Sequence, residues 1–356
     1  MKLFRKKGSV NPDSGLNAIN TEHPVSNKSK SRREILKGLA ALPAVALLPG
    51  INNIYSPEVK SDITQDLKAL TGPVPSGKLG KLNVSRMILG CNMIISHAHA
   101  RDLIYTDSLI KNYYTEDKIF RTLQLAEAAG VNTIVNVTEA MDQFNKYKKE
   151  YNSKMQAICM ATLPKNDLFS NINLCRDKGA SAIYVHGRVC DAYVKEGKYD
   201  ELAKVFSYIQ SLGFQAGVGA HCLETVEWCE KEGFNTDFYM KAFHHDKYWS
   251  ALPEENREQY IEIGPSFTDH NKYCDNMWDL HPNRTVEVMK NVKKPFIAFK
   301  TLAAGAIRPK DGFRYAFENG ADFVCVGMFD FQVIENANTL TTILGDLGKR
   351  QREWFS

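Results

Sequence analysis

Short apolar runs alternate with amphipathic segments along the chain from residue 85 onward. The runs are apolar at consecutive positions, which is typical of strands buried on both faces of a parallel sheet. Helical patterns separate them, for example at residues 117–130, 199–213 and 310–320. The predicted strands are residues 87–93, 133–137, 157–161, 182–186, 216–220, 238–243, 296–302 and 323–327.

Most of the helical segments end in glycine, and the next apolar run follows within a few residues. Eight such units in succession favour a closed barrel over an open doubly wound sheet. No G-x-G-x-x-G follows the first strand, which disfavours a Rossmann fold. We therefore predict an α/β protein with a single (β/α)₈ TIM barrel over residues 85–356, closed by a helix from residue 332 to about residue 352.

A long connection follows the sixth predicted strand, at residues 244–280. In a barrel, long loops after strands lie on the catalytic face, so this segment is a candidate lid or substrate-binding cap. A purely structural excursion is the alternative. Its aromatic residues are Trp249, Tyr260, Phe267, Tyr273 and Trp278.

The segment before the barrel has the features of a leader. Residues 31–37 (SRREILK) resemble the twin-arginine export motif, and an apolar run at residues 38–49 is too short to span a bilayer. We predict a disordered leader with a twin-arginine signal peptide at residues 1–55, then a linker and hairpin at residues 56–84. The resemblance implies the twin-arginine translocase as a partner, a periplasmic or extracellular location, and no stable membrane anchor after cleavage.

The net charge and the cysteines argue against two classes of protein, nucleic-acid-binding proteins and disulfide scaffolds. The 356-residue chain has a net charge of +4, and much of this positive charge lies in the first 40 positions. The remainder is close to neutral, so we expect no nucleic-acid partner. The eight cysteines are dispersed and form no C-x-x-C pair, which is not the pattern of a disulfide scaffold.

Histidines gather where the predicted strands end, which is where barrel enzymes carry their active sites. Six of the nine histidines lie there: His97, His99, His186, His221, His244 and His245. Converging imidazoles suit a divalent metal or acid–base chemistry. We predict His99, His221 and His244 as ligands of zinc, manganese or iron. Binding of substrate hydroxyls and capping of loops is the alternative.

The same histidines resemble part of the pattern of metal-dependent amidohydrolases. Those enzymes have H-x-H after the first strand, further ligands after later strands, and an aspartate after the eighth. His97-x-His99, His186, His221, His244 and Asp330 stand at comparable places. The pattern departs in two ways, because H-x-H lies past the strand end and the fourth-strand residue is His186 rather than Lys or Glu.

Lys300 lies in an apolar segment, AFKTLAAG. A lysine directed into a barrel is costly unless it is paired or catalytic, and desolvation makes it a candidate base or Schiff-base nucleophile. Residues 300–308 resemble the seventh-strand segment of class I deoxyribose-phosphate-type aldolases. Lys241 is a candidate companion, and a structural ion pair is the alternative. The predicted catalytic residues are Lys300, Glu139 and His186.

Two glycines resemble the phosphate-binding corner found in many barrels. Gly305 follows the seventh predicted strand and Gly327 ends the eighth. Without a side chain, their N–H groups approach an anion closely, so both are predicted cofactor-binding positions. Tight turns are the alternative.

The entry to the barrel resembles the aldo/keto reductases. The likeness lies in residues 80–90 (GKLNVSRMILG), residues 129–132 (AGVN), His186 and residues 327–337. This resemblance implies the barrel fold. It does not imply the reductase reaction, because residues 136–141 (NVTEAM) lack the family's Asp and Tyr, and the third strand lacks its Lys. NADP is therefore not the expected cofactor.

Together these features predict an exported barrel enzyme. It acts on a small polar, carbohydrate-derived substrate through a histidine-rich site, with hydrolase, lyase or isomerase chemistry. The alternatives are an aldo/keto-reductase-like oxidoreductase, a Schiff-base aldolase using Lys300, and a non-catalytic carbohydrate-binding barrel.

Overall fold

The computed structural model describes residues 62–97, 103, 105–257 and 276–356. The predicted leader and signal peptide lie outside the described residues, as do His99 and positions 258–275 of the long loop. Residues Val59–Ser356 belong to one compact unit. Among the described residues, no helix is both long and apolar enough to cross a bilayer.

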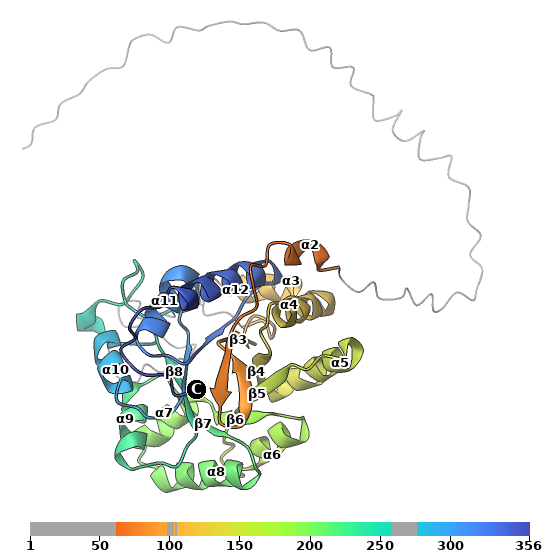
Figure 1. Ribbon diagram of the computed structural model, residues 1–356. Coiled ribbons are helices and arrows are strands. Elements are labelled where there is room, and N and C mark those ends of the chain that lie inside the picture. Colours follow the sequence, from red (N-terminus) through yellow and green to blue (C-terminus); the bar gives the residue numbers. More distant parts are fainter. Residues whose placement is uncertain (1–61, 98–102, 104, 258–275) are drawn as a thin grey trace, which may run out of the picture. The chain divides into compact units, whose positions relative to one another are not determined.

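Eight parallel strands form a closed barrel, which confirms the predicted fold class. Their order around the barrel is their order in the chain, and the last strand pairs with the first through Val324 and Met87. Helices surround the strands (Figure 1). The strands are β3 (Met87–Gly90), β4 (Thr133–Val137), β5 (Gln156–Ala161), β6 (Ala182–Val185), β7 (Ala216–Ala220), β8 (Phe238–Ala242), β9 (Phe296–Phe299) and β10 (Phe323–Val326).

The outer layer is helical, and its apolar faces pack on the outward-facing strand residues. Its main helices are α4 (Glu116–Ala128), α5 (Met141–Tyr151), α6 (Ser170–Asp177), α7 (Gly187–Lys195), α8 (Tyr199–Ser211), α9 (Leu223–Lys231), α10 (Pro282–Met289), α11 (Pro309–Glu318) and α12 (Asp330–Gly345). Shorter elements are α2 (Thr64–Leu67), α3 (Thr106–Tyr113) and the 3₁₀ turns η2 (Thr138–Ala140), η3 (Glu254–Asn256) and η4 (Ala303–Gly305).

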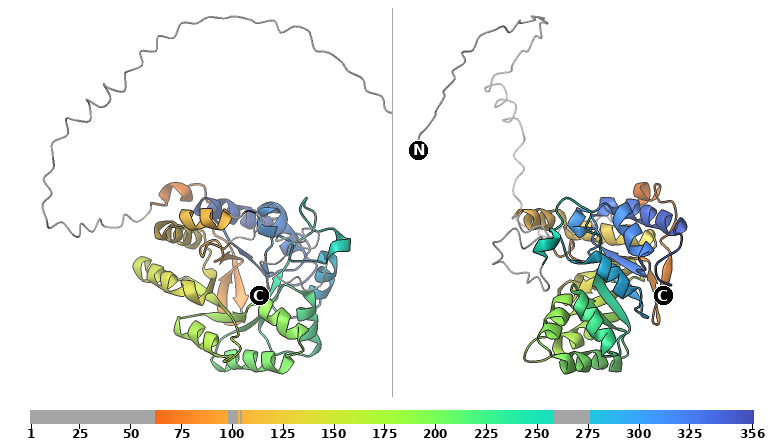
Figure 2. Two further views of the ribbon diagram at one scale, coloured as in Figure 1. Left: turned by 180° about the vertical axis from the view of Figure 1, so that it is seen from behind. Right: turned by 90° about the vertical axis from the view of Figure 1, so that its left-hand side faces the viewer.

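A hairpin closes the amino-terminal end of the barrel. Strands β1 (Ser76–Leu79) and β2 (Leu82–Ser85) pair antiparallel, and Leu79 and Val84 are buried against the inward-facing barrel residues. The C-terminus lies beside this hairpin (Figures 1 and 2), where Ser356 contacts Arg86. The hairpin end is therefore plugged, and the opposite end of the barrel remains for chemistry.

The predicted last helix needs a correction. Helix α12 begins at Asp330 and ends at Gly345, before the expected end near residue 352. The tail after it turns back to the barrel, because the buried side chain of Arg352 pairs with Asp322 at 2.8 Å.

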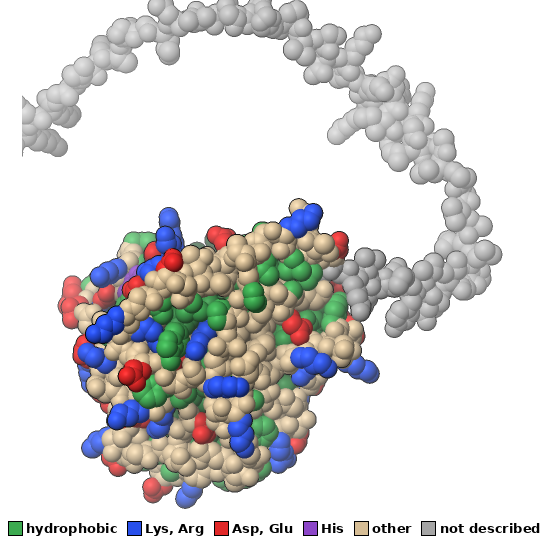
Figure 3. Space-filling view, viewed as in Figure 1, with side chains coloured by type: hydrophobic (Ala, Val, Ile, Leu, Met, Phe, Trp, Pro, Cys, Tyr) green, Lys and Arg blue, Asp and Glu red, His purple; other side chains and the backbone are tan. Residues whose placement is uncertain are grey.

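On the face seen in Figure 3, basic and acidic side chains are interspersed.

Candidate active site

Three predicted residues follow barrel strands at the open end of the barrel. His186 directly follows β6, His221 follows β7, and Lys300 follows β9. The ring centroids of His186 and His221 lie 5.9 Å apart. Trp278, from the far end of the long loop, lies 4.8 Å from the His221 ring, and its ring centroid is 3.6 Å from Nζ of Lys300. These side chains form one cluster, which we call the mouth cluster.

His221 is held by a buried carboxylate. Its Nδ1 lies 3.0 Å from Oδ2 of Asp191, a residue of α7 that is 6% exposed. The same carboxylate accepts the backbone N–H groups of His221 and Cys222, and the hydroxyl of Thr225 at 2.7 Å. The carboxylate thus places the proton of a neutral His221 ring on Nδ1, and Nε2 is the basic nitrogen. Burial raises the pKa of Asp191 to about 6.

Glycine allows His221 to approach the chain that carries His186. A Cβ atom on Gly187 would lie 2.8 Å from both Cε1 and Nδ1 of His221. A Cβ atom on Gly219 would lie 2.4 Å from the carbonyl oxygen of Val185, which is too close for any side chain. The pairing of His221 with Asp191 therefore depends on two residues without side chains.

Lys241 supports the pair from the outer side of the barrel. It is fully buried, and its Nζ donates to the carbonyl oxygens of His221 at 2.8 Å and of Ala242 at 2.7 Å. Its positive charge also favours ionisation of Asp191, against the larger effect of burial on the pKa of that carboxyl. Lys241 is therefore placed to position His221, rather than to accompany Lys300 as the sequence suggested.

His186 is held in its neutral form. Burial lowers its pKa to about 3, and the nearby basic groups of His221, Lys300 and Arg188 act in the same direction. A neutral imidazole offers one N–H donor and one acceptor, so His186 suits hydrogen bonding to a substrate oxygen.

Lys300 lies just past the end of β9, rather than within an apolar strand as the sequence suggested. Its backbone is left-handed, with φ of 58°, which is strained for a residue with a side chain. Its side chain is partly buried over Trp278. Strain of this kind is concentrated at functional positions, which agrees with a role for Lys300 in the cluster.

His244, predicted as a metal ligand, has both ring nitrogens in use. Its Nδ1 donates to the carbonyl oxygen of His245 at 2.8 Å, and its Nε2 accepts the backbone N–H groups of Trp278 and Asp279, each at 3.0 Å. No ring lone pair is left for a metal in this arrangement. The structure gives His244 a role in holding the loop instead.

Two other predicted acids lie apart from the mouth cluster. Glu139 is exposed in η2, where it accepts a hydrogen bond from Thr138 at 3.0 Å. Asp330, the counterpart of the amidohydrolase aspartate, faces α4 and pairs with Lys118 at 2.9 Å and Arg121 at 3.2 Å. Asp330 is therefore a structural ion-pair residue between α12 and α4.

The metal positions other than His244, and the phosphate positions, stay predictions. Among the described residues, no group of three or more His, Cys, Asp or Glu side chains is arranged to hold a metal, and His99 lies outside them. Gly305 is exposed at the end of η4 with φ of 93°, which fits a turn. A Cβ atom on Gly327 would lie 3.0 Å from Cγ of Met93.

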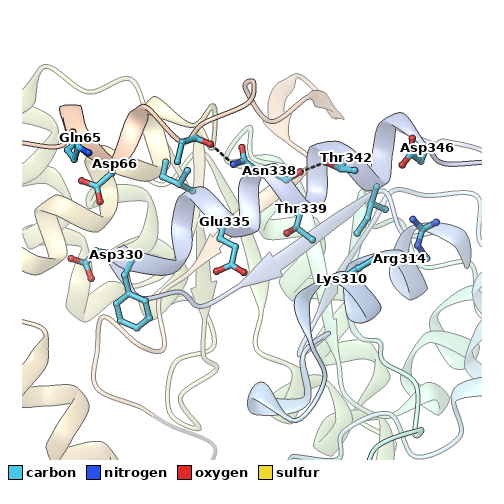
Figure 4. Close-up of a pocket in the computed structure, with 14 residues that line it drawn as sticks. Gln65, Asp66, Lys310, Arg314, Asp330, Glu335, Asn338, Thr339, Thr342 and Asp346 are labelled. Carbon is cyan, nitrogen blue, oxygen red and sulfur yellow. Dashed lines mark hydrogen bonds between the residues drawn. The ribbon is translucent and has the colours of Figure 1, made fainter.

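A groove of about 790 Å³ runs along the outer side of α12 (Figure 4). Its side chains come from α2, α11, α12 and the residues just after α2 and α12, not from the ends of the barrel strands. Several of its polar groups are already paired: Asp66 with Arg121, and Asn338 with Thr71 and the carbonyl oxygen of Ala69. We therefore place the candidate active site at the mouth cluster, where acid–base groups converge.

Sequence reasoning finds His186, His221 and Lys300 but not the contacts that Asp191 and Trp278 make with them. Asp191 lies in α7, one helical turn after Gly187, the first residue of that helix. Its only sequence signal is that of an aspartate on the apolar side of a short helix. Trp278 is predicted only as one aromatic residue of the long loop.

Comparison with known proteins supports the fold. No protein-family model matches the chain, and no curated protein matches it. Two solved structures described as putative aldo-keto reductases from Pseudomonas aeruginosa are similar, each with a TM-score of 0.52. Their identities are 13% and 12%, covering 78% and 77% of this chain and 98% and 99% of theirs. At this identity the likeness extends to the barrel alone.

Proposed function

We propose that the chain is an enzyme of the lyase or isomerase type that transfers a proton on a small polar, carbohydrate-derived substrate. The observation that carries the proposal is the hydrogen bond between Nδ1 of His221 and Asp191 at the open end of the barrel. A buried carboxylate that orients an imidazole makes its other nitrogen a general base. The same base would activate water in a hydrolase.

Three members of the mouth cluster, His221, Lys300 and His186, have roles in this proposal together with Asp191. Nε2 of His221 removes the proton, and Asp191 stabilises the imidazolium that forms. Lys300 supplies a positive charge for the oxyanion that develops when a proton leaves a carbon beside a carbonyl. His186, neutral because its pKa is lowered to about 3, donates a hydrogen bond to a substrate oxygen.

Solvent exchange tests the proposal even while the product is unidentified. The purified protein is incubated in D₂O with aldoses, ketoses and sugar acids, and NMR follows loss of carbon-bound protons. We expect exchange with at least one compound, abolished in His221→Gln. His281→Gln, at the start of α10 and outside the cluster, is the matched control. Exchange that persists in His221→Gln contradicts the assignment of the base.

A Schiff-base reaction at Lys300 is the second candidate, favoured by its position at the end of the seventh barrel strand. The lysine amine would add to a substrate carbonyl and lose water to form an imine. Borohydride would reduce that imine to a stable secondary amine. A substrate-dependent mass increase on the Lys300 peptide, absent in Lys300→Met, supports this reaction, whereas an unmodified peptide rules it out.

A metal bound by His99 and His221 is an alternative to proton removal by His221, because both uses need the lone pair on Nε2. Nδ1 of His221 is committed to Asp191, so Nε2 is the nitrogen that would bind a metal. Elemental analysis of protein purified without added metal or chelator tests this site. About one equivalent of zinc, manganese or iron, lost in both His99→Ala and His221→Ala, would support it. No metal in the wild type would contradict it.

Export and cofactor use are proposed from the sequence. The twin-arginine translocase would carry the folded protein to the periplasm or the cell exterior, and Arg32→Lys with Arg33→Lys would leave it inside the cell. NADP is not the proposed cofactor, because residues 136–141 lack the Asp and Tyr of the reductase pattern. Unchanged NADPH fluorescence on addition of the protein is the expected result.

A further inference from the structure

His244 joins two parts of the chain that lie far apart in sequence. It is fully buried just beyond β8, and its Nδ1 donates to the carbonyl oxygen of the next residue, His245. Its Nε2 accepts two backbone N–H groups, from Trp278 and Asp279. One side chain thereby fixes the backbone at the far end of the long loop.

The segment that His244 holds, Trp278 and Asp279, also contacts α10. Oδ1 of Asp279 accepts the hydroxyl of Thr285, in α10, at 2.6 Å. Both residues are buried, so these bonds are shielded from water. The backbone of Trp278 is therefore anchored to β8 through His244 and to α10 through its neighbour.

The indole of Trp278, whose backbone is anchored in this way, contacts two other residues of the mouth cluster. Trp278 is 8% exposed, and its ring contacts both Nζ of Lys300 and the ring of His221. A cation over an aromatic face is attracted to it, so the indole favours one position of the lysine amine. The indole also limits how His221 turns. Moving the Trp278 backbone would therefore move a contact surface shared by Lys300 and His221.

We propose that His244 is a positioning residue, which holds Trp278 against Lys300 and His221 through two backbone hydrogen bonds. The consequence for catalysis rests on the proposed function, whereas the positioning itself does not. Only the neutral ring with its proton on Nδ1 makes these bonds, because a second proton on Nε2 would face two N–H donors. The role therefore requires a side chain that donates at one end and accepts at the other.

Chemical labelling of Lys300 tests the positioning without any substrate. Full-length protein is treated with limiting acetic anhydride, and mass spectrometry gives the acetylation rate of each lysine. We expect several-fold faster acetylation of Lys300 in His244→Leu, which lacks both hydrogen bonds. His244→Gln keeps a donor and an acceptor, so we expect its rate to return toward the wild-type value. Lys204, exposed on α8, is the internal reference.

A double variant separates positioning from general loss of structure. Trp278→Ala should also accelerate acetylation of Lys300, and adding His244→Leu to it should produce no further increase. Independent, multiplicative effects of the two substitutions would overturn the proposal. So would equal Lys300 rates in wild type, His244→Leu and His244→Gln. If His244→Leu does not fold, the comparison of His244→Gln with Trp278→Ala decides, because the proposal predicts acceleration only in the latter.

The outcome is distinguishable from failure of the proposed function. Lys300 labelling reports the position of a side chain whether or not the protein catalyses proton exchange. If exchange is found, His244→Leu should lower its rate, and His244→Gln should restore most of it. Failure to detect exchange leaves the labelling result intact.

Discussion

One carboxylate fixes both the ring and the backbone of His221. Oδ2 of Asp191 lies 3.0 Å from Nδ1 of His221 and 3.0 Å from its backbone nitrogen. The other oxygen accepts the hydroxyl of Thr225 at 2.7 Å. His221 therefore cannot change its orientation without breaking a buried network, which is the preorganisation that a general base requires.

Asp191→Asn is expected to lower the rate of proton exchange with little change in KM. The amide cannot stabilise an imidazolium, and its NH₂ group favours the wrong ring tautomer. We expect a loss of roughly 100-fold to 10,000-fold in kcat. The measurement is the initial NMR exchange rate at saturating substrate. Thr225→Val, which removes one hydrogen bond but keeps the charge, is the control and should lose far less.

The pH profile of the wild type checks the same network. Since the pKa of Asp191 is raised to about 6, protonation of this carboxylate should reduce the exchange rate as the pH falls through 6. Thr225→Val should keep this acidic limb. A wild-type rate that stays constant from pH 7 to pH 5 would count against Asp191 as the partner of the base.

His186 should make the folded state less stable in mild acid. Its pKa is lowered to about 3, whereas a histidine in the unfolded chain titrates near its ordinary pKa of 6.5. As the pH falls from 6.5 toward 3, the unfolded chain takes up a proton that the folded chain does not, so the free energy of unfolding decreases. The stabilising contribution of neutral His186 is present above pH 6.5 and is lost across this window.

Urea unfolding at pH 7 and pH 5 measures this effect. We expect the wild type to lose more stability between these two values than His186→Gln, which does not titrate. Asp191 acts in the opposite direction, because its raised pKa lets the folded state take up a proton first. The contribution of His186 is therefore measured by comparing the wild type with His186→Gln, not by the pH dependence of the wild type alone. Equal losses in the two proteins would show that His186 titrates normally.

The left-handed backbone at Lys300 predicts an unusual order of stability. At most positions a glycine variant is less stable than an alanine variant, because glycine makes the unfolded chain more flexible. At φ of 58°, however, a side chain costs about 1 kcal/mol. Lys300→Gly should therefore be at least as stable as Lys300→Ala in urea unfolding. The same pair at Lys204, in the middle of α8, should show the usual order. Higher stability of Lys300→Ala would contradict a left-handed backbone at this position.

The barrel is predictable from sequence because its signals are local. Consecutive apolar positions identify the strands. The rule that barrel enzymes carry their chemistry at the carboxyl ends of the strands makes His186, His221 and Lys300 candidate site residues. Side-chain partners are not predictable in this way, because they depend on rotamers and on contacts between distant segments. An imidazole is equally suited to a metal and to backbone groups, so the sequence cannot show that His244 binds Trp278 and Asp279.

The same limit applies to the chain end. Apolar periodicity suggests a helix to about residue 352, but α12 ends at Gly345 and the tail turns toward the barrel. Nothing in the residues around Arg352 predicts that its side chain is buried in an ion pair. Its partner Asp322 directly precedes β10, and only the closed barrel brings the two together.

Arg352→Ala is expected to be the most destabilising of the substitutions considered. Arg352 is 5% exposed and Asp322 is fully buried, and their nitrogen and oxygen atoms lie 2.8 Å apart. Removing the guanidinium would leave a buried carboxylate without its charge partner, which costs about 3–5 kcal/mol. The backbone carbonyl of Val292 would also lose its donor, Nε of Arg352. Equilibrium urea unfolding measures the change.

Two further variants show whether burial is the cause. Arg314→Ala removes an exposed ion pair with Glu318 and should change the free energy of unfolding by less than about 1 kcal/mol. Arg352→Met combined with Asp322→Asn removes both charges, so it should be milder than Arg352→Ala alone. If the double variant is as unstable as Arg352→Ala, the packing and backbone hydrogen bonds of Arg352, rather than its charge, hold the tail against the barrel.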